Sequence, residues 1–244
     1  MLIQPLEFVP LLQNVFDNRG RVGCCLIHAV GDYRIRGCGV EWADIRLRPM
    51  STFKVLNSLI ALETGVIDPL EGIDWDGGPA WSDALKTRMT LDKALSGSAL
   101  WFFQILARRI GVTKYRRYLA ECSYGNAECC GDIDSFWLNG SLLISPREQL
   151  EFVSRFSDGD LPFSEAVISA VQEMLIVESA AEGVLRGKTG YANSNGEHFG
   201  WFIGYQTFTG HAFRVVTLLE MSDESQLGER REIAEECIRL MACG

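Results

Sequence analysis

Segments typical of β-strands lie at the two ends of this chain, and the long stretch between them has few strand signals. The strand-like segments are residues 21–28, 33–40, 184–191, 200–208 and 212–221. Between residues 66 and 180 the spacing of apolar residues favours helices instead. Because strands from both ends can pair in one sheet, the middle of the chain is expected to form a helical insertion.

The order of these segments predicts an α+β fold of the α/β sandwich type. We expect an antiparallel sheet of about five strands, drawn from both chain ends and flanked by helices. Residues 1–244 would form a single domain, with a sheet subdomain of residues 1–48 and 183–244 and a helical subdomain of residues 49–182. Helices are predicted at residues 5–17, 52–65, 90–97, 99–110, 113–121, 146–156, 164–175 and 229–241. A functional site would then lie between the sheet and the helical lobe.

Local signals support particular boundaries within this fold. Ser145 with Glu148 three residues later predicts a capped helix start. Thr209-Gly210 favours a tight turn between the last two strands. If Gly31-Asp32 is a two-residue hairpin turn, counting back from it places Cys25 opposite Cys38. A disulfide between these two residues needs suitable local geometry, and the alternative is a set of buried free thiols.

Composition excludes several classes of function. The net charge is −9 and the basic residues are mostly scattered, which argues against nucleic acid and against an anionic membrane surface. The chain has no apolar run long enough to cross a membrane. Eight cysteines without a C-x-x-C pair, and only three histidines, give no zinc-ligand spacing, so we expect no metal. The N-terminus lacks the basic region and the cleavage site of a signal peptide.

Ser51 and Lys54 form an S-x-x-K motif at the start of a predicted helix. Residues three apart share one helix face, and the first turn offers free backbone N–H groups. A serine nucleophile needs a base, and a lysine can serve when apolar surroundings lower its pKa. The alternative is a helix start with a surface lysine.

Three further segments carry polar residues in a suggestive order. They are S-G-S at residues 96–98, Y-G-N at 124–126 and K-T-G at 188–190. Taken singly, each has an ordinary interpretation: Ser98 as a helix cap, Y-G-N as a turn, and Lys188 as a protective lysine on an edge strand. Their joint occurrence after S-x-x-K is much harder to obtain by chance.

With these four motifs in place, the chain resembles the class D, or oxacillinase-type, serine β-lactamases of the penicillin-recognising superfamily. The resemblance extends over nearly the whole chain and includes W-D-G at residues 75–77, L-A-R-R-I-G at 106–111 and F-W-L-N-G-S-L-L-I-S at 136–145. Y-G-N and F-W-L favour class D over the other serine classes. The implied fold is that of the β-lactamases and transpeptidases.

The resemblance implies a role for each matching residue. Ser51 would be the acylated nucleophile, and Lys54 would carry a carboxyl group derived from CO2; no other cofactor is implied. Trp137 would donate its indole N–H to that group, and Ser98 would relay a proton to the lactam nitrogen. An anionic group on a lysine is a base usable near neutral pH.

Further matching residues would bind the substrate. Lys188, Thr189, Gly190 and Arg230 would line the side that holds the substrate carboxylate, since an arginine fork suits a carboxylate. The backbone N–H groups of Ser51 and Tyr191 would form the oxyanion hole. Tyr124 and Asn126 would hold the neighbouring loop. Leu100 departs from the family, which usually has valine there, and would crowd the pocket of Lys54 or restrict hydrolytic water.

Three functions remain in competition at this point. The first is hydrolysis of penicillin-type β-lactams through a serine acyl-enzyme, by a monomer or homodimer without nucleic acid or membrane partners. The second is a β-lactam sensor that keeps the acyl adduct, and the third is a D,D-peptidase-like or esterase-like protein. The resemblance implies a periplasmic or secreted protein.

Overall fold

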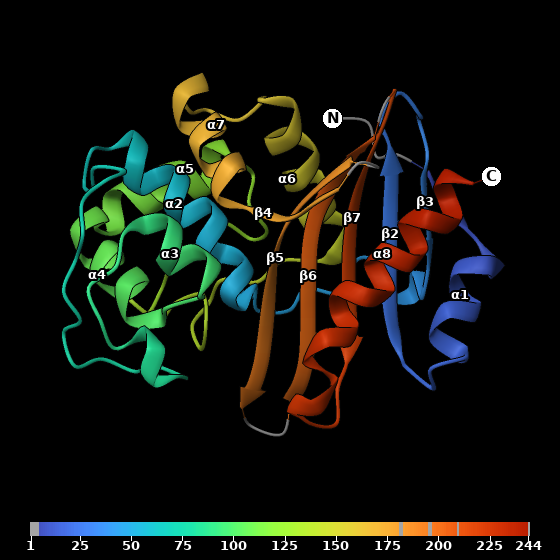
Figure 1. Ribbon diagram of the computed structural model, residues 1–244, viewed down its shortest axis with the longest axis horizontal. Helices are drawn as coiled ribbons and strands as arrows, with labels where there is room; N and C mark the ends of the chain where they lie inside the picture. The colour runs from blue at the N-terminus through green and yellow to red at the C-terminus, as the bar shows by residue number, and fades with distance from the viewer. Residues whose placement is uncertain (1–4, 181–182, 195–196, 209, 244) are drawn as a thin grey trace.

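The computed structural model describes residues 5–180, 183–194, 197–208 and 210–243. Within these residues the chain forms a seven-stranded sheet in the order β1-β3-β2-β7-β6-β5-β4. The strands are β1 (Leu6–Phe8), β2 (Gly23–Ala29), β3 (Ile35–Cys38), β4 (Ile176–Ala180), β5 (Gly183–Ser194), β6 (Glu197–Phe208) and β7 (His211–Glu220). The sheet occupies one side of the molecule and most of the helices occupy the other (Figure 1).

Helices cover both faces of the sheet and form the separate lobe. They are α1 (Pro10–Asp17), α2 (Lys54–Glu63), α3 (Leu91–Ser96), α4 (Leu100–Ile110), α5 (Val112–Glu121), α6 (Pro146–Asp158), α7 (Glu165–Met174) and α8 (Glu229–Ala242). Short 3-10 helices are η1 (Val40–Trp42), η2 (Met50–Phe53), η3 (Asp83–Leu85) and η4 (Glu224–Gly228). Helices α1 and α8 lie against the face of the sheet that is turned away from the lobe (Figure 1).

The predicted α+β architecture with an inserted helical lobe is confirmed, but the strand count was too low. Strands β1 and β4 were missed, and β1 pairs with β3 in parallel, so the sheet is mixed. Residues 5–17 are not one helix, because Leu6–Phe8 pair with β3 and the helix begins only at Pro10. A three-residue strand is too short to show alternation in sequence, and Pro10 fits the first turn of a helix.

Several local predictions are confirmed. Ser145 and Glu148 form a reciprocal capping box at the start of α6. Cys25 and Cys38 are paired residues of β2 and β3, as the turn predicted, but both are free thiols in the structure. No disulfide joins them, and the alternative of buried free thiols describes both residues. Of the predicted turn Thr209-Gly210, Thr209 lies outside the described residues.

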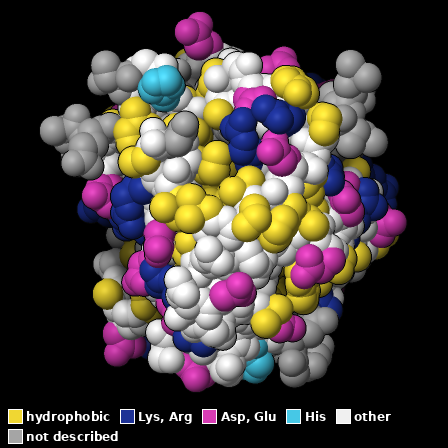
Figure 2. All heavy atoms as spheres, turned by 90° about the vertical axis from the view of Figure 1, so that its right-hand side faces the viewer, with side chains coloured by type: hydrophobic (Ala, Val, Ile, Leu, Met, Phe, Trp, Pro, Cys, Tyr) yellow, Lys and Arg dark blue, Asp and Glu magenta, His cyan; other side chains and the backbone are white. Residues whose placement is uncertain are grey.

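The two faces of the sheet bury different cores because successive strand residues point to opposite sides. Cys24 and Leu26 of β2 join the large core shared with the helical lobe, whereas Cys25 and Ile27 join a smaller core under α1 and α8. The end of the molecule away from the lobe shows a band of apolar side chains between charged groups (Figure 2). No helix among the described residues is long and apolar enough to cross a membrane.

Candidate active site

Ser51 lies in η2, where the chain passes between the sheet and the helical lobe. The preceding residue, Met50, has a φ of 51°, a left-handed conformation that is uncommon for a residue with a side chain. Its backbone N–H donates to the carbonyl of Trp137 at 3.3 Å. A side chain at Gly190 of β5 would lie 3.1 Å from the carbonyl oxygen of Pro49. Strained backbone and close packing thus fix the position of Ser51 against the sheet.

Lys54 begins α2 directly behind the serine. Its side chain is 1 % exposed, and its Nζ lies 2.5 Å from the Oγ of Ser51 and 3.3 Å from the Oγ of Ser98. Burial, followed by the charge of Lys188, holds the pKa of Lys54 well below its ordinary value. The interpretation of Lys54 as a surface lysine is therefore wrong, and a buried amine with a lowered pKa faces the serine hydroxyl.

Ser98 completes a chain of polar groups that leads from α2 to β5. Its φ is 56°, and Ala99 rather than Ser98 is the N-cap of α4, so the helix-cap interpretation is wrong. The Nζ of Lys188 lies 3.1 Å from the Oγ of Ser98. Since Nζ of Lys54 approaches the same oxygen, Ser98 lies between two lysines and can pass a proton along the chain of groups.

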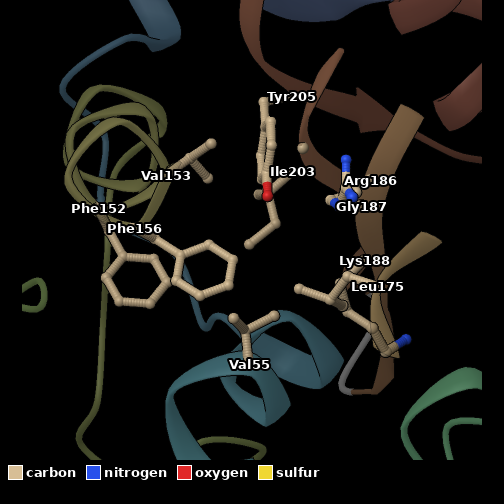
Figure 3. Close-up of a pocket in the computed structure, with 11 residues that line it drawn as sticks. Val55, Phe152, Val153, Phe156, Leu175, Arg186, Gly187, Lys188, Ile203 and Tyr205 are labelled. Atoms are coloured by element: carbon tan, nitrogen blue, oxygen red, sulfur yellow. The ribbon is translucent and has the colours of Figure 1, made fainter. Parts of the chain in front are cut away.

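Lys188 is also buried, not exposed on an edge strand. Burial, followed by the charge of Arg230, lowers its pKa to about 7. Behind the strand, apolar side chains from α2, α6 and β6 surround a cavity of about 10 Å³ (Figure 3). Val55 and Phe156 point into this cavity, and Lys188 is among the residues that line it, so apolar side chains lie close to the lysine.

Trp137 lies in the aromatic part of the lobe core, and its backbone carbonyl accepts from the N–H of Met50, the residue before Ser51. Its ring stacks on Phe53 at a centroid distance of 5.3 Å and meets Phe136 edge-on at 5.2 Å. Within the part of the chain that the structure describes, its buried Nε1 has no hydrogen-bond partner. A buried N–H without an acceptor is costly, so this donor is suited to a group that is added at the site.

Phe103 is a site residue that the sequence reasoning missed. The Nζ of Lys54 lies 5.6 Å from the centroid of the Phe103 ring, in cation–π range. In the sequence, this phenylalanine follows the pattern of any core position on a helix, and no signal distinguishes it. Leu100 begins α4 on the same lobe and packs, partly buried, against the large core.

Arg230 reaches the site from α8, across β6. Its Nη1 donates to the carbonyl of Gly190 at 2.6 Å, and its Nε donates to the carbonyl of Leu227 at 2.7 Å. A side chain at Gly200 would lie 2.3 Å from Cδ of Arg230, so the glycine opens this path. Burial lowers the pKa of Arg230 to about 10. Thr189 lies on β5 between Lys188 and Gly190, whose carbonyl the arginine contacts, so the basic residues predicted to bind a carboxylate approach the same part of β5.

The remaining predicted residues support the site from outside. The Tyr191 side chain packs on the α8 side, with its hydroxyl 3.3 Å from Nδ1 of His198, so only its backbone is available to Ser51. Tyr124 is buried and meets Phe152 edge-on. The side chain of Asn126 donates to the carbonyl of Ser141 at 2.7 Å and accepts from the backbone N–H of Leu143. It therefore links the Y-G-N loop to the segment that leads into α6. No metal-binding cluster of His, Cys, Asp or Glu occurs among the described residues.

This geometry brings together the groups that serine acyl transfer needs: a hydroxyl beside a buried amine, a second serine between two lysines, and a further basic side chain, that of Arg230, nearby. The model of the penicillin binding protein transpeptidase domain matches residues 39–239, so the chain belongs to that family. Within the family, it is similar to a class D β-lactamase from Nostoc, at 32 % identity and a TM-score of 0.90, with 95 % of this chain and 98 % of that chain covered. The chain is therefore a member of the class D β-lactamase group.

Two curated relatives have similar sequences. The probable β-lactamase YbxI of Bacillus subtilis is 39 % identical over 164 residues, which are 67 % of this chain and 61 % of the relative. The regulatory protein BlaR1 of Bacillus licheniformis is 39 % identical over 170 residues, which are 69 % of this chain and 28 % of the relative. The chain thus spans less than two thirds of each of these two proteins.

Proposed function

We propose that this protein hydrolyses the β-lactam amide of penicillin-type antibiotics through an acyl-enzyme on Ser51. The observation that carries the proposal is the 2.5 Å separation of Ser51 Oγ and Lys54 Nζ, together with the burial of that lysine. A lysine that stays neutral near pH 7 can take the serine proton, whereas an exposed ammonium cannot.

Acylation follows from the order of the polar groups. Lys54 takes the proton of Ser51 as Oγ forms a bond with the lactam carbonyl carbon. The backbone N–H groups of Ser51 and Tyr191 would stabilise the negative charge on the carbonyl oxygen. When the C–N bond breaks, Ser98 delivers a proton to the lactam nitrogen, and Lys54 or Lys188 replaces it. In deacylation Lys54 is again the base: it takes a proton from the water that attacks the ester carbonyl carbon, and this proton returns to Ser51 Oγ as the ester C–O bond breaks.

We also propose that Lys54 is carboxylated by CO2 in the active protein. A neutral amine in an apolar pocket reacts with CO2, and the product would supply an anionic base near neutral pH. The unpartnered Nε1 of Trp137 supports this assignment, because it would donate a hydrogen bond to the added oxygens. Phe53 holds the indole ring by stacking, which fixes the direction of that donor.

The substrate carboxylate would be held by Lys188, Thr189 and Arg230. Two of these are buried cations on adjoining elements, and a buried cation without an anion is costly, so an anionic ligand is favoured here. Family membership further suggests that the protein acts outside the cytoplasmic membrane. The same membership includes a regulatory relative, and a sensor that retains the acyl group is therefore the second candidate.

Intact-protein mass spectrometry over time with benzylpenicillin separates these functions. A hydrolase shows an adduct that appears and then disappears as the substrate is consumed, faster with added bicarbonate. Ser51→Ala, the matched control, should show no adduct and lower turnover by about 10⁴-fold or more. A permanent adduct would favour the sensor, and the absence of any adduct would contradict both. Release of D-alanine from D-alanyl-D-alanine peptides would indicate a peptidase.

A further inference from the structure

A groove of about 280 Å³ shares Lys188 and Thr189 with the proposed carboxylate site. Its walls come from Leu95 and Ser96 at the end of α3, from Met174 and Leu175 at the end of α7, from Ile176 and Val177 of β4, and from Phe202 of β6. A ligand held by Lys188 and Thr189 would therefore extend between α3 and β4.

The β4 wall of this groove exposes apolar side chains that the fold does not need to expose. Ile176 is 41 % exposed and Val177 is 37 % exposed, on the outermost strand of the sheet. Edge strands usually carry charged residues or proline at such positions. The pairing of β4 with β5 shifts between Ile176 and Glu178, which inserts Val177 as an extra residue. A bulge of this kind re-aims side chains and is often found beside active sites.

The charges at the outer rim of the groove are already neutralised. Arg231 of α8 lines the groove, but its guanidinium is paired with Glu178 at 2.5 Å and also with Glu235. The attraction for an anion is therefore concentrated at Lys188, and the remainder of the groove favours an uncharged apolar group.

The chemistry of bicyclic β-lactams identifies the part of a substrate that would occupy such a groove. In a cephem, the ring carbon next to the carboxylate-bearing carbon carries the variable substituent, so this group lies just beyond the carboxylate. In a penicillin, the corresponding carbon carries only two methyl groups. The geometry points to a specificity subsite: the groove beside β4 binds a large, uncharged, apolar substituent at this position of a cephem. This inference rests on the proposed β-lactam-binding function.

The test compares two cephems with the same acyl side chain, one with a methyl and one with a phenylvinyl substituent at that carbon. Acylation rate constants are measured by rapid mixing, quenching and intact-protein mass spectrometry. This measurement applies equally to a hydrolase and to a sensor. The double variant Ile176→Ser/Val177→Ser should lower the ratio of the phenylvinyl rate to the methyl rate about tenfold, since it removes the apolar side chains that β4 contributes to the groove. Because the measured quantity is a ratio of two rates, any effect of the variant that is common to both substrates cancels.

A matched control is Val30→Ser, which changes a half-exposed valine near the β2–β3 turn. This control should leave the ratio within about twofold of the unchanged protein. An unchanged ratio in the double variant, with adducts still formed, would overturn the subsite alone. Failure of both cephems to acylate the unchanged protein would overturn the proposed function and the subsite together.

Discussion

The two faces of the sheet are built on different principles. The face under α8 is a conventional core, in which Cys25, Cys237 and their apolar neighbours are fully buried. The face toward the helical lobe buries Lys54 and Lys188 as well, and it leaves the indole N–H of Trp137 without a partner in the described part of the chain. Buried polar groups of this kind lower stability, so the concentration of buried lysines and of an unpartnered N–H around Ser51 marks the lobe face as the functional one.

The largest contrast is expected between Lys54→Met and Cys237→Ala. The first change replaces a buried amine with an apolar chain of similar length, so acylation should slow by about 10²–10⁴-fold while the free energy of unfolding rises by about 1 kcal/mol or more. The second leaves a small cavity under α8, so unfolding should become easier by about 1–2 kcal/mol with acylation unchanged. Urea unfolding and acylation rates on the same samples provide the comparison.

If both variants lost stability and activity together, the two faces would not differ as described. The same would hold if Lys54→Met retained its activity, because the lysine would then be a structural residue. A parallel measurement of the far-ultraviolet circular dichroism of each variant shows whether it is folded.

A smaller effect is expected from Trp137→Phe. Phenylalanine retains the packing on Phe53 but removes the N–H that is proposed to hold the added carboxyl group. Turnover should fall about 10- to 100-fold, and part of the loss should be recovered at high bicarbonate, because a weakened carbamate can be restored by mass action. The turnover rate is measured as a function of bicarbonate concentration in Trp137→Phe and in the unchanged protein. Equal bicarbonate dependence would show that the indole N–H has another role.

The smallest effect concerns pH. The pKa of Lys188 is lowered to about 7, first by burial and then by Arg230, so the side chain is charged below this pH and loses its charge as the pH rises through it. Binding of a substrate carboxylate should weaken in the same window. We expect the ratio of acylation rates for a penicillin and its methyl ester to fall a few-fold between about pH 6 and 8. Lys188→Arg should have a flat ratio, and a fall in that variant would assign the effect to another group.

The sequence predicted those features that depend on neighbours along the chain. The Ser145 capping box, the hairpin register of Cys25 and Cys38, and the positions of strands β2, β3, β5, β6 and β7 along the chain all follow from local patterns. The short strands β1 and β4 were missed because three to five residues give no clear period.

Those parts of the site that depend on close approach in space were also missed. Phe103 contacts Lys54 only because α4 crosses behind α2, and Gly200 is needed only because Arg230 passes over β6. The left-handed backbone of Met50 is imposed by its neighbours and not by its residue type. None of these features has a periodic or compositional signal.

The central claim is that the buried amine beside Ser51 is the base of the site and works in carboxylated form. Carbon-13 nuclear magnetic resonance after equilibration with ¹³C-bicarbonate tests it most directly. The account predicts one carbamate signal in the unchanged protein, a weaker signal in Trp137→Phe and none in Lys54→Met, in the same order as the turnover rates. Full turnover in a protein that shows no carbamate signal at saturating bicarbonate would contradict it.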